Sequence, residues 1–162
     1  MDDLDLKGFS GRVRLFPLPG FVMFPHSVAP LHIFEPRYRA MFEDALAGDR
    51  LIAMVRLLGD GGPRPPIEEV GCLGRIIHDE RLPDGRFNIL LLGRKRVRLG
   101  REIEDDQRLY RIAEAELIED VPAAGVATEA AARDELVELL RQATGVDADL
   151  MDLLLRADTL GA

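Results

Sequence analysis

The sequence predicts an α+β protein, in which a β-rich domain of residues 1–122 precedes a helical annex of residues 123–162. Short apolar runs of strand length recur as far as residue 118, and glycine and proline separate them. After residues 122–125 the pattern changes, and leucines recur at helical spacing. With 162 residues, the chain is long enough to bury a core.

The first element is a strand over residues 13–15, where apolar and polar residues alternate. We expect the prolines from Pro17 onward to stop it, because proline cannot donate a ladder hydrogen bond. The same alternation at Leu31 and Ile33 predicts a second strand, which ends before Pro36. We expect the phenylalanines of this region to fold inward over one end of the sheet: Phe16, Phe21, Phe24 and Phe34.

A short amphipathic helix follows the second strand. It begins at Pro36, because proline suits the first helical turn, and Glu35 beside it favours the positive end of the helix dipole. Gly48 ends the helix. The buried face has i, i+3, i+4, i+7 spacing and consists of Tyr38, Met41, Phe42 and Ala45.

Four more strands complete the β-rich domain. Residues 51–58 form an almost continuous apolar run, and a loop rich in glycine and proline follows. The next two strands form a hairpin with Asp84 and Gly85 at its turn. Gly93 interrupts the second hairpin strand, which predicts a bulge or a sharp bend. Residues 110–118 form the last strand.

Two amphipathic helices are predicted in the annex. Thr128 caps the first, which ends at Gly145, and Asp147 opens the second. Both carry leucine stripes that need a cover. We therefore expect that the native chain continues beyond Ala162, or that a second copy covers the stripes in a homodimer.

The charge of the chain is unevenly distributed. Residues 1–101 carry 16 Lys and Arg against 13 Asp and Glu, and residues 102–162 carry 5 against 16, which together give the net charge of −8. An acidic second half disfavours nucleic acid as a partner. No apolar run reaches the roughly 20 residues of a membrane span, and the single Cys72 excludes an internal disulfide. We expect a cytoplasmic protein without membrane contact.

The sequence contains no assembled catalytic set, and we expect no enzyme activity. His26, His32 and His78 lack metal-ligand spacing, so we expect no metal. The glycines of residues 59–62 precede proline instead of a helix start, so no phosphate cradle is indicated. We therefore expect no cofactor.

Several segments resemble the N-terminal substrate-binding domain of Lon proteases: "LFPLPGFVMFPHSVAPLHIFEPRYRAMFEDAL", "VGCLGRI", "LPDGRFNILLLG" and "RKRVRL". The similarity runs from residue 12 to residue 119. It implies a PUA-like β pseudobarrel with one early helix, followed by a helical part. Such domains also occur alone in short bacterial proteins, and a relative occurs in cereblon-type proteins. The resemblance assigns these residues to the family's structural motif: Pro25, Pro30, Phe34, Glu35, Pro36, Arg37, Tyr38, Gly71, Gly74, Asp84, Gly85 and Gly93.

A full Lon protease also has an ATPase and a peptidase, whose motifs can be sought directly. The ATPase needs a Gly-x-x-x-x-Gly-Lys-Ser/Thr loop, and neither Lys7 nor Lys95 lies in that context. The peptidase needs a serine beside a lysine base, and neither Ser10 nor Ser27 has that setting. The resemblance therefore covers the recognition domain and implies a non-catalytic module.

The resemblance implies that the module binds unfolded or tagged polypeptides, with a protease or another protein as a further partner. We expect an apolar groove and sheet-edge hydrogen bonds to hold the polypeptide. The density of apolar residues before the second strand places this groove at one loop and one helix end. The residues expected to form it are Phe21, Val22, Met23, Phe24 and Arg37.

Two alternatives stay open at this point. In the first, the chain is a PUA-like RNA-binding module that uses Arg94, Arg96 and Arg98, which alternate along one strand and share a face. The net charge of −8 disfavours it. In the second, the chain is an adaptor for a folded protein partner.

Overall fold

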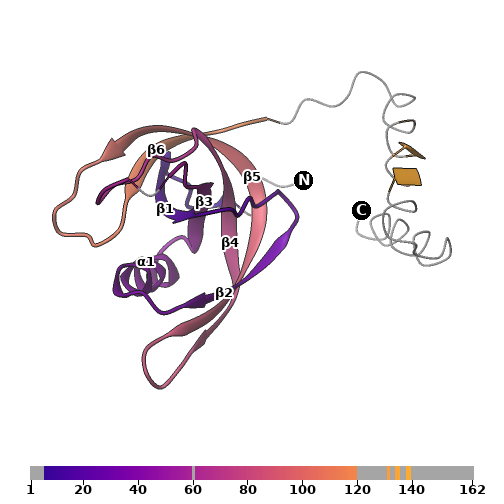
Figure 1. Cartoon of the computed structure of the whole chain (residues 1–162). Coiled ribbons are helices and arrows are strands. Elements are labelled where there is room, and N and C mark those ends of the chain that lie inside the picture. Colours follow the sequence, from indigo (N-terminus) through magenta and orange to yellow (C-terminus); the bar gives the residue numbers. More distant parts are fainter. Residues whose placement is uncertain (1–5, 60, 120–130, 132–133, 136–137, 140–162) are drawn as a thin grey trace. The chain divides into compact units, whose positions relative to one another are not determined.

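The computed structural model describes residues 6–59, 61–119, 131, 134–135 and 138–139 of the chain. By its internal contacts, the chain divides into two units, residues 1–119 and 120–162. The described residues of the first unit form six strands and one helix (Figure 1). Their bounds are β1 (Arg12–Leu18), β2 (Val28–Ile33), α1 (Pro36–Ala47), β3 (Leu51–Arg56), β4 (Val70–Arg81), β5 (Phe87–Ile103) and β6 (Ile112–Leu117).

The six strands form one sheet in the order β2-β5-β4-β3-β1-β6. β6 also pairs with β5, so the sheet curls round on itself. The 17-residue β5 permits this, because its first half pairs with β2 and its second half with β6. β1 and β3 run parallel, and the other pairings of these strands are antiparallel. The fold confirms the predicted β pseudobarrel with one early helix.

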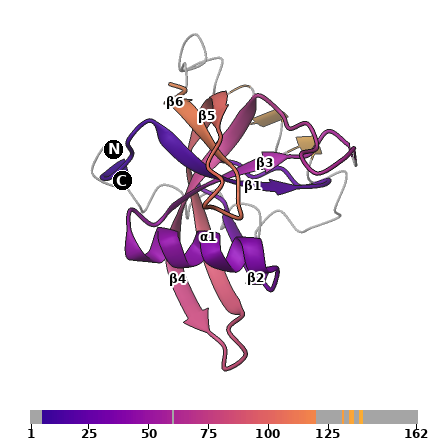
Figure 2. The ribbon, with the colours of Figure 1, turned by 90° about the vertical axis from the view of Figure 1, so that its left-hand side faces the viewer.

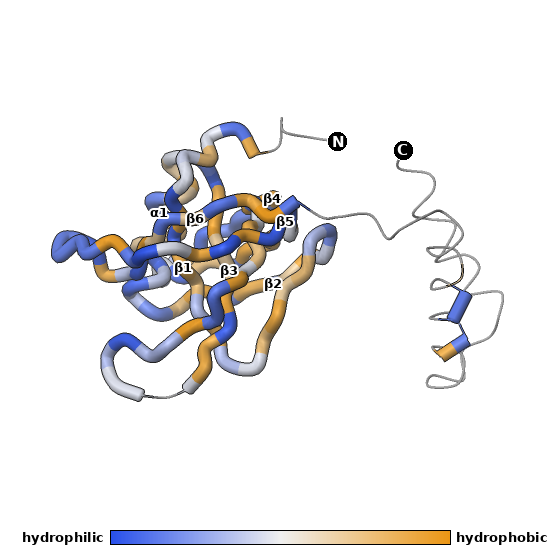
Figure 3. Tube along the Cα trace, turned by 90° about the horizontal axis from the view of Figure 1, so that it is seen from above, coloured by the Kyte–Doolittle hydropathy of each residue, from blue (hydrophilic) through white to orange (hydrophobic). Residues whose placement is uncertain are grey.

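Buried apolar side chains form two clusters on the two faces of the curled sheet. β3 contributes to both, because successive residues of a strand point to opposite faces. Leu51 and Ala53 join the cluster inside the curl, and Ile52 and Met54 join the cluster that includes α1. The continuous apolar run therefore marks a strand that is buried on both faces. Figure 3 shows hydrophobic and hydrophilic residues alternating along other strands.

Helix α1 covers the outer face of the sheet and follows the sequence prediction closely. Pro36 is its first residue, and Gly48 caps its end by donating its N–H to the Ala45 carbonyl at 3.1 Å. The four residues expected on its inner face are all buried. Figure 2 shows the helix crossing in front of β4 and β5, whose side chains share its cluster.

The prediction that Pro17 stops the first strand was wrong. β1 continues to Leu18, and Pro17 pairs with Val55 in the parallel ladder. The Leu18 carbonyl accepts a hydrogen bond from the Leu57 N–H on the β3 side of the strand. Because the backbone groups of successive strand residues point to opposite sides, the backbone nitrogen of Pro17 points away from β3. There the pairing with β6 has already ended at Arg14. The missing N–H of Pro17 therefore costs the sheet no hydrogen bond.

Of the predicted annex, residues 131, 134, 135, 138 and 139 are helical, and their side chains are exposed. The remaining parts of the two predicted helices lie outside the described residues, as does the predicted boundary at residues 122–123. No helix in the described part of the chain is both long and apolar enough to cross a membrane.

Candidate functional site

The loop between β1 and β2 borders a pocket of about 330 Å³, which we call the loop pocket. All four loop residues that the sequence singles out line it: Phe21, Val22, Met23 and Phe24. Met54 of β3 and the β4 residues Val70 and Cys72 line it as well. Its wall thus combines one loop with residues of β3, β4 and β5, the last through Arg96.

The side chains of the loop do not all turn inward. Phe21 is 41% exposed and Phe24 is 65% exposed, as is Phe34 outside the loop at 61%. The prediction that these three phenylalanines fold over the end of the sheet was therefore wrong, and Phe16 alone of the four predicted is buried. Met23 fills the core position instead, at 6% exposure. The residues on each side of Met23 present apolar side chains to solvent.

Backbone hydrogen bonds fix the loop against β5 at Gly93. The Gly93 N–H donates to the Ser27 carbonyl and the His26 N–H donates to the Gly93 carbonyl, both at 2.8 Å. A Cβ atom on Gly93 would lie 2.2 Å from the Phe24 carbonyl oxygen, so only glycine fits this contact. The ladder between β4 and β5 shifts its register at Arg94, which confirms the irregularity predicted at Gly93.

Other glycines of the predicted motif also mark close approaches. A Cβ on Gly71 would lie 2.7 Å from the Met54 carbonyl oxygen, and one on Gly74 would lie 2.7 Å from the Leu91 side chain. Bulkier residues at these positions would push β4 away from its neighbours. Gly85 has a φ of 82° at the hairpin turn, which favours glycine.

The polar residues around the start of α1 have structural partners. Arg37 donates from Nε to the Glu35 carboxylate at 2.9 Å. The Tyr38 hydroxyl donates to the Pro17 carbonyl at an oxygen–oxygen distance of 3.5 Å, which is long for a hydrogen bond. Pro30 lies on β2, the outermost strand of the sheet, where a missing N–H is tolerated.

Cys72 lines the loop pocket as an inert thiol. It is 2% exposed, and burial raises the pKa of its thiol to about 11. The thiol is therefore protonated at neutral pH, whereas a reactive cysteine needs the thiolate. Within the described ranges, no group of three or more His, Cys, Asp or Glu side chains is placed to hold a metal ion.

Arg37 lies apart from the loop residues with which the sequence groups it. It lines a second pocket of about 240 Å³, together with Arg64, Arg108 and Arg111. We call this the arginine pocket. Sequence reasoning missed it, because its arginines come from α1, the loop after β3 and the segment that leads into β6.

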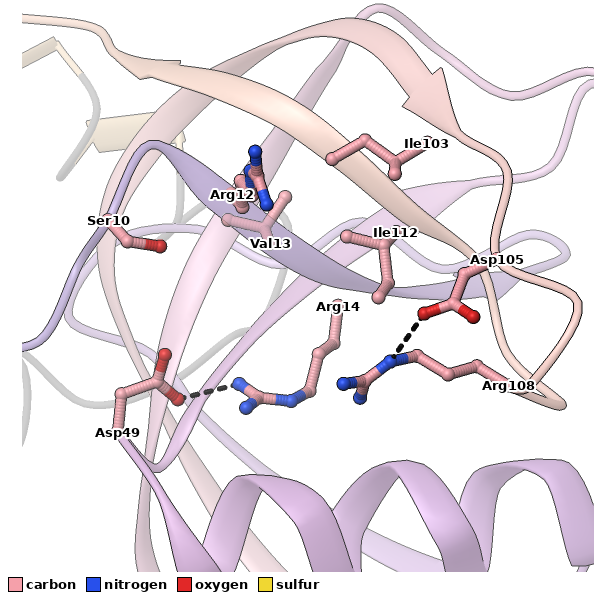
Figure 4. A pocket seen from close by; sticks show the side chains of 9 residues that line it. All are labelled: Ser10, Arg12, Val13, Arg14, Asp49, Ile103, Asp105, Arg108 and Ile112. Carbon is pink, nitrogen blue, oxygen red and sulfur yellow. Dashed lines mark hydrogen bonds and ion pairs between the residues drawn. The ribbon is translucent and has the colours of Figure 1, made fainter.

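A third pocket, of about 230 Å³, lies beside β1 (Figure 4). Arg14 and Arg108 both line it, and the Arg14 guanidinium turns away from Arg108 toward Asp49. Arg14 donates to Asp49 at 2.6 Å, and Arg108 donates to Asp105 at 2.9 Å. Asp49 also accepts the Leu51 N–H at 3.0 Å, which ties the end of α1 to β3. Arg14 and Arg108 each have an aspartate partner in this pocket, and these two ion pairs serve the fold, while Arg12 lines the pocket as a third arginine.

The three arginines of the RNA-binding alternative do not form an even row. Arg94 lies at the register shift of β5 and is half-buried, whereas Arg96 and Arg98 are exposed. Arg96 also lines the loop pocket. The bulge thus breaks the alternation on which the prediction of a single basic face depends.

Comparison with known proteins links the chain to one family. The family described as "ATP-dependent protease La (LON) substrate-binding domain" matches residues 12–161. Lon protease from Trichlorobacter lovleyi is 28% identical over 146 residues, which cover 86% of this chain and 18% of that protein. Lon protease 3 from Sorangium cellulosum is 32% identical over 126 residues, or 76% of this chain and 15% of that protein. The chain therefore spans less than a fifth of the length of these relatives.

Two solved structures share the fold. The N-terminal domain of the Mycobacterium avium complex Lon protease superposes with a TM-score of 0.65 at 17% identity, covering 90% of this chain and 75% of that one. A Lon N-terminal domain protein from Xanthomonas campestris gives a TM-score of 0.62 at 24% identity, covering 87% and 75%. At these identities the likeness establishes the fold alone.

Proposed function

The chain belongs to the Lon substrate-binding domain family, and we propose that it is a non-catalytic module that binds unfolded or tagged polypeptides in its loop pocket. It acts in the cytoplasm, with a protease or another protein as its further partner. The observation that supports this most is the gathering of exposed apolar side chains at one pocket. Phe21, Val22, Phe24 and Val70 all line it and are all at least 41% exposed.

Such a pocket suits an unfolded chain for a physical reason. A folded protein buries its large apolar side chains, whereas an unfolded protein offers them to any apolar surface within reach. Burial of one such side chain against Phe24 and Val22 contributes roughly 25 cal/mol per Å² of apolar surface removed from water. The anchoring of the loop at Gly93 holds these side chains in place before binding, which lowers the entropy lost on association.

The edge of the sheet adds a second means of binding. β2 is the outermost strand and pairs only with β5 among the described strands. An extended polypeptide could hydrogen-bond to its open side. Pro30, in the middle of β2, has no N–H to offer, which limits this pairing and protects the edge against unwanted association. We therefore assign most of the affinity to the loop pocket.

Capture of a permanently unfolded protein by variants of the full chain tests this proposal. Phe24→Ser should weaken the capture by about fivefold or more, as expected for the loss of an aromatic anchor. Phe34→Ser is the matched control, because Phe34 is equally exposed and lies outside the loop pocket. It should leave the capture unchanged. Met23 is unsuitable for this test, because its substitution would disturb the core.

Equal capture by both variants would contradict the placement of the site. Structured RNA, included at two salt concentrations, tests the alternative that the chain is an RNA-binding module. Retention of RNA alone, with loss at higher salt, would reject the proposal and move the site to Arg94, Arg96 and Arg98.

A further inference from the structure

We infer that the arginine pocket binds a carboxylate group of the polypeptide that the module holds. That the carboxylate belongs to a polypeptide rests on the proposed function. The preference of the pocket for a carboxylate rests only on the residues that line it. Arg37, Arg64, Arg108 and Arg111 line this pocket, and none of its described lining residues is an aspartate or a glutamate. Both other pockets discussed above have at least one acidic residue in their lining.

Arg111 builds the pocket and does not serve as a ligand. Its Nε donates to Glu102 at 2.9 Å, its Nη2 donates to the other oxygen of the same carboxylate, and its Nη1 donates to the Pro65 carbonyl at 2.9 Å. The side-chain hydrogen bond from Arg111 lowers the pKa of Glu102, so this pair is charged at neutral pH. All three nitrogens of Arg111 thus donate a hydrogen bond: Nε and Nη2 hold Glu102 of β5, and Nη1 holds the loop that carries Arg64.

Arg37 and Arg64 keep donors for a ligand. Arg37 uses Nε and Nη2 on Glu35, and its Nη1 has no partner among the described residues. Among the described residues, the ion pair of Arg64 is a 3.9 Å contact with Glu104, which is itself 88% exposed, and Arg64 also acts electrostatically on Glu102. Both arginine side chains are 51% exposed. Two guanidinium groups with open N–H groups at one pocket form a suitable receptor for an oxyanion.

The start of α1 adds to this preference. Arg37 is the second residue of the helix, whose first turn contains no acidic residue and whose N-terminus has no side-chain cap. The positive end of the helix dipole therefore lies beside the pocket, and the acidic residue next to it is Glu35 at the N-cap, whose carboxylate also pairs with Arg37.

A carboxylate fits the pocket better than a phosphate does. The arginines are largely compensated by Glu35, Glu102 and the aspartates that hold Arg108, which leaves little excess charge for a dianion. The other lining residues are mainly apolar, and one of them, Leu109, is 68% exposed. An apolar surface beside an oxyanion site favours a carboxylate attached to an apolar group. A polypeptide supplies this chemistry at its C-terminus or at an acidic residue next to an apolar one.

The test titrates the full chain, labelled with ¹⁵N, with three small probes and follows its NMR signals. N-acetyl-leucine represents a C-terminus, N-acetyl-glutamate α-amide represents an acidic side chain, and N-acetyl-leucinamide lacks a carboxylate. We expect at least one carboxylate probe to bind about fivefold more tightly than the amide, the sum of two exposed ion pairs. The probe that binds more tightly shows whether the carboxylate belongs to a C-terminus or to an acidic side chain.

Arg64→Ala should abolish the preference for the carboxylate. Arg101→Ala is the control, because Arg101 is 83% exposed, has a 3.8 Å contact with Glu114 as its ion pair among the described residues, and does not line the pocket. This control removes one positive charge, as Arg64→Ala does, and should keep the preference for the carboxylate probe. Equal binding of acid and amide probes, persistence of the preference in Arg64→Ala, or tighter binding of inorganic phosphate at equal ionic strength would overturn the inference.

The capture of unfolded protein, measured on the same samples, separates the two proposals. Capture without any carboxylate preference would defeat the inference and leave the proposed function standing. A carboxylate preference without capture would support the pocket chemistry and defeat the proposed function.

Discussion

Phe42→Ala is expected to lower the free energy of unfolding by about 3–5 kcal/mol. Phe42 is fully buried, and its ring meets that of Phe16 edge to face with the centroids 5.8 Å apart. Truncation would leave a cavity between α1 and the sheet that the surrounding strands cannot fill. Because domains are stable by only about 5–15 kcal/mol, the variant should be close to unfolding. Urea denaturation of the full chain measures the change.

Phe34→Ala provides the matched comparison. Its side chain is 61% exposed, so the same truncation should change the stability by no more than about 0.5 kcal/mol. Equal losses in the two variants would contradict the packing of α1 against the sheet.

Gly93→Ala is expected to cost about 1–3 kcal/mol and to abolish most of the capture of unfolded protein. The new methyl group would lie 2.2 Å from the Phe24 carbonyl oxygen and 3.2 Å from Cys72 Sγ. The loop can avoid this collision only by moving away from β5, which breaks its two hydrogen bonds to Gly93. Denaturation and capture experiments on the same protein measure both effects.

Gly59→Ala is the control for this substitution. A Cβ at Gly59 meets no atom within 4 Å, and its φ is not in the left-handed region. Both stability and capture should therefore stay close to those of the wild type. Retained capture in Gly93→Ala would show that the loop conformation described here is not needed for binding.

The elements that the sequence predicts well are those with a strong local signal. Pro36, Gly48 and a regular apolar spacing define α1 without reference to the rest of the chain. Asp84 and Gly85 mark the hairpin in the same way. Pro17 was misjudged because the effect of a proline in a strand depends on whether a neighbour needs its N–H. That neighbour is known only once the strand order is known.

The site was predictable in part for the same reason. The apolar density before β2 points to the four loop residues, and all of them line one pocket. The sequence did not reveal that Met23 turns inward, because an irregular loop has no periodicity that assigns its faces. Nor did it reveal the arginine pocket, because only the folded arrangement of α1, the loop after β3 and the segment before β6 brings Arg37, Arg64 and Arg111 together.

The most direct test of the central claim is site-specific photo-crosslinking to an unfolded polypeptide. A photoreactive amino acid replaces Val22 in one variant and Ile77 in another, since these side chains are 56% and 48% exposed and only Val22 lines the loop pocket. We predict that an unfolded protein crosslinks at position 22 and not at position 77, and that the same protein in its native state crosslinks at neither. Equal crosslinking at both positions, or crosslinking at position 77 alone, would contradict the assignment of the loop pocket as the polypeptide-binding site.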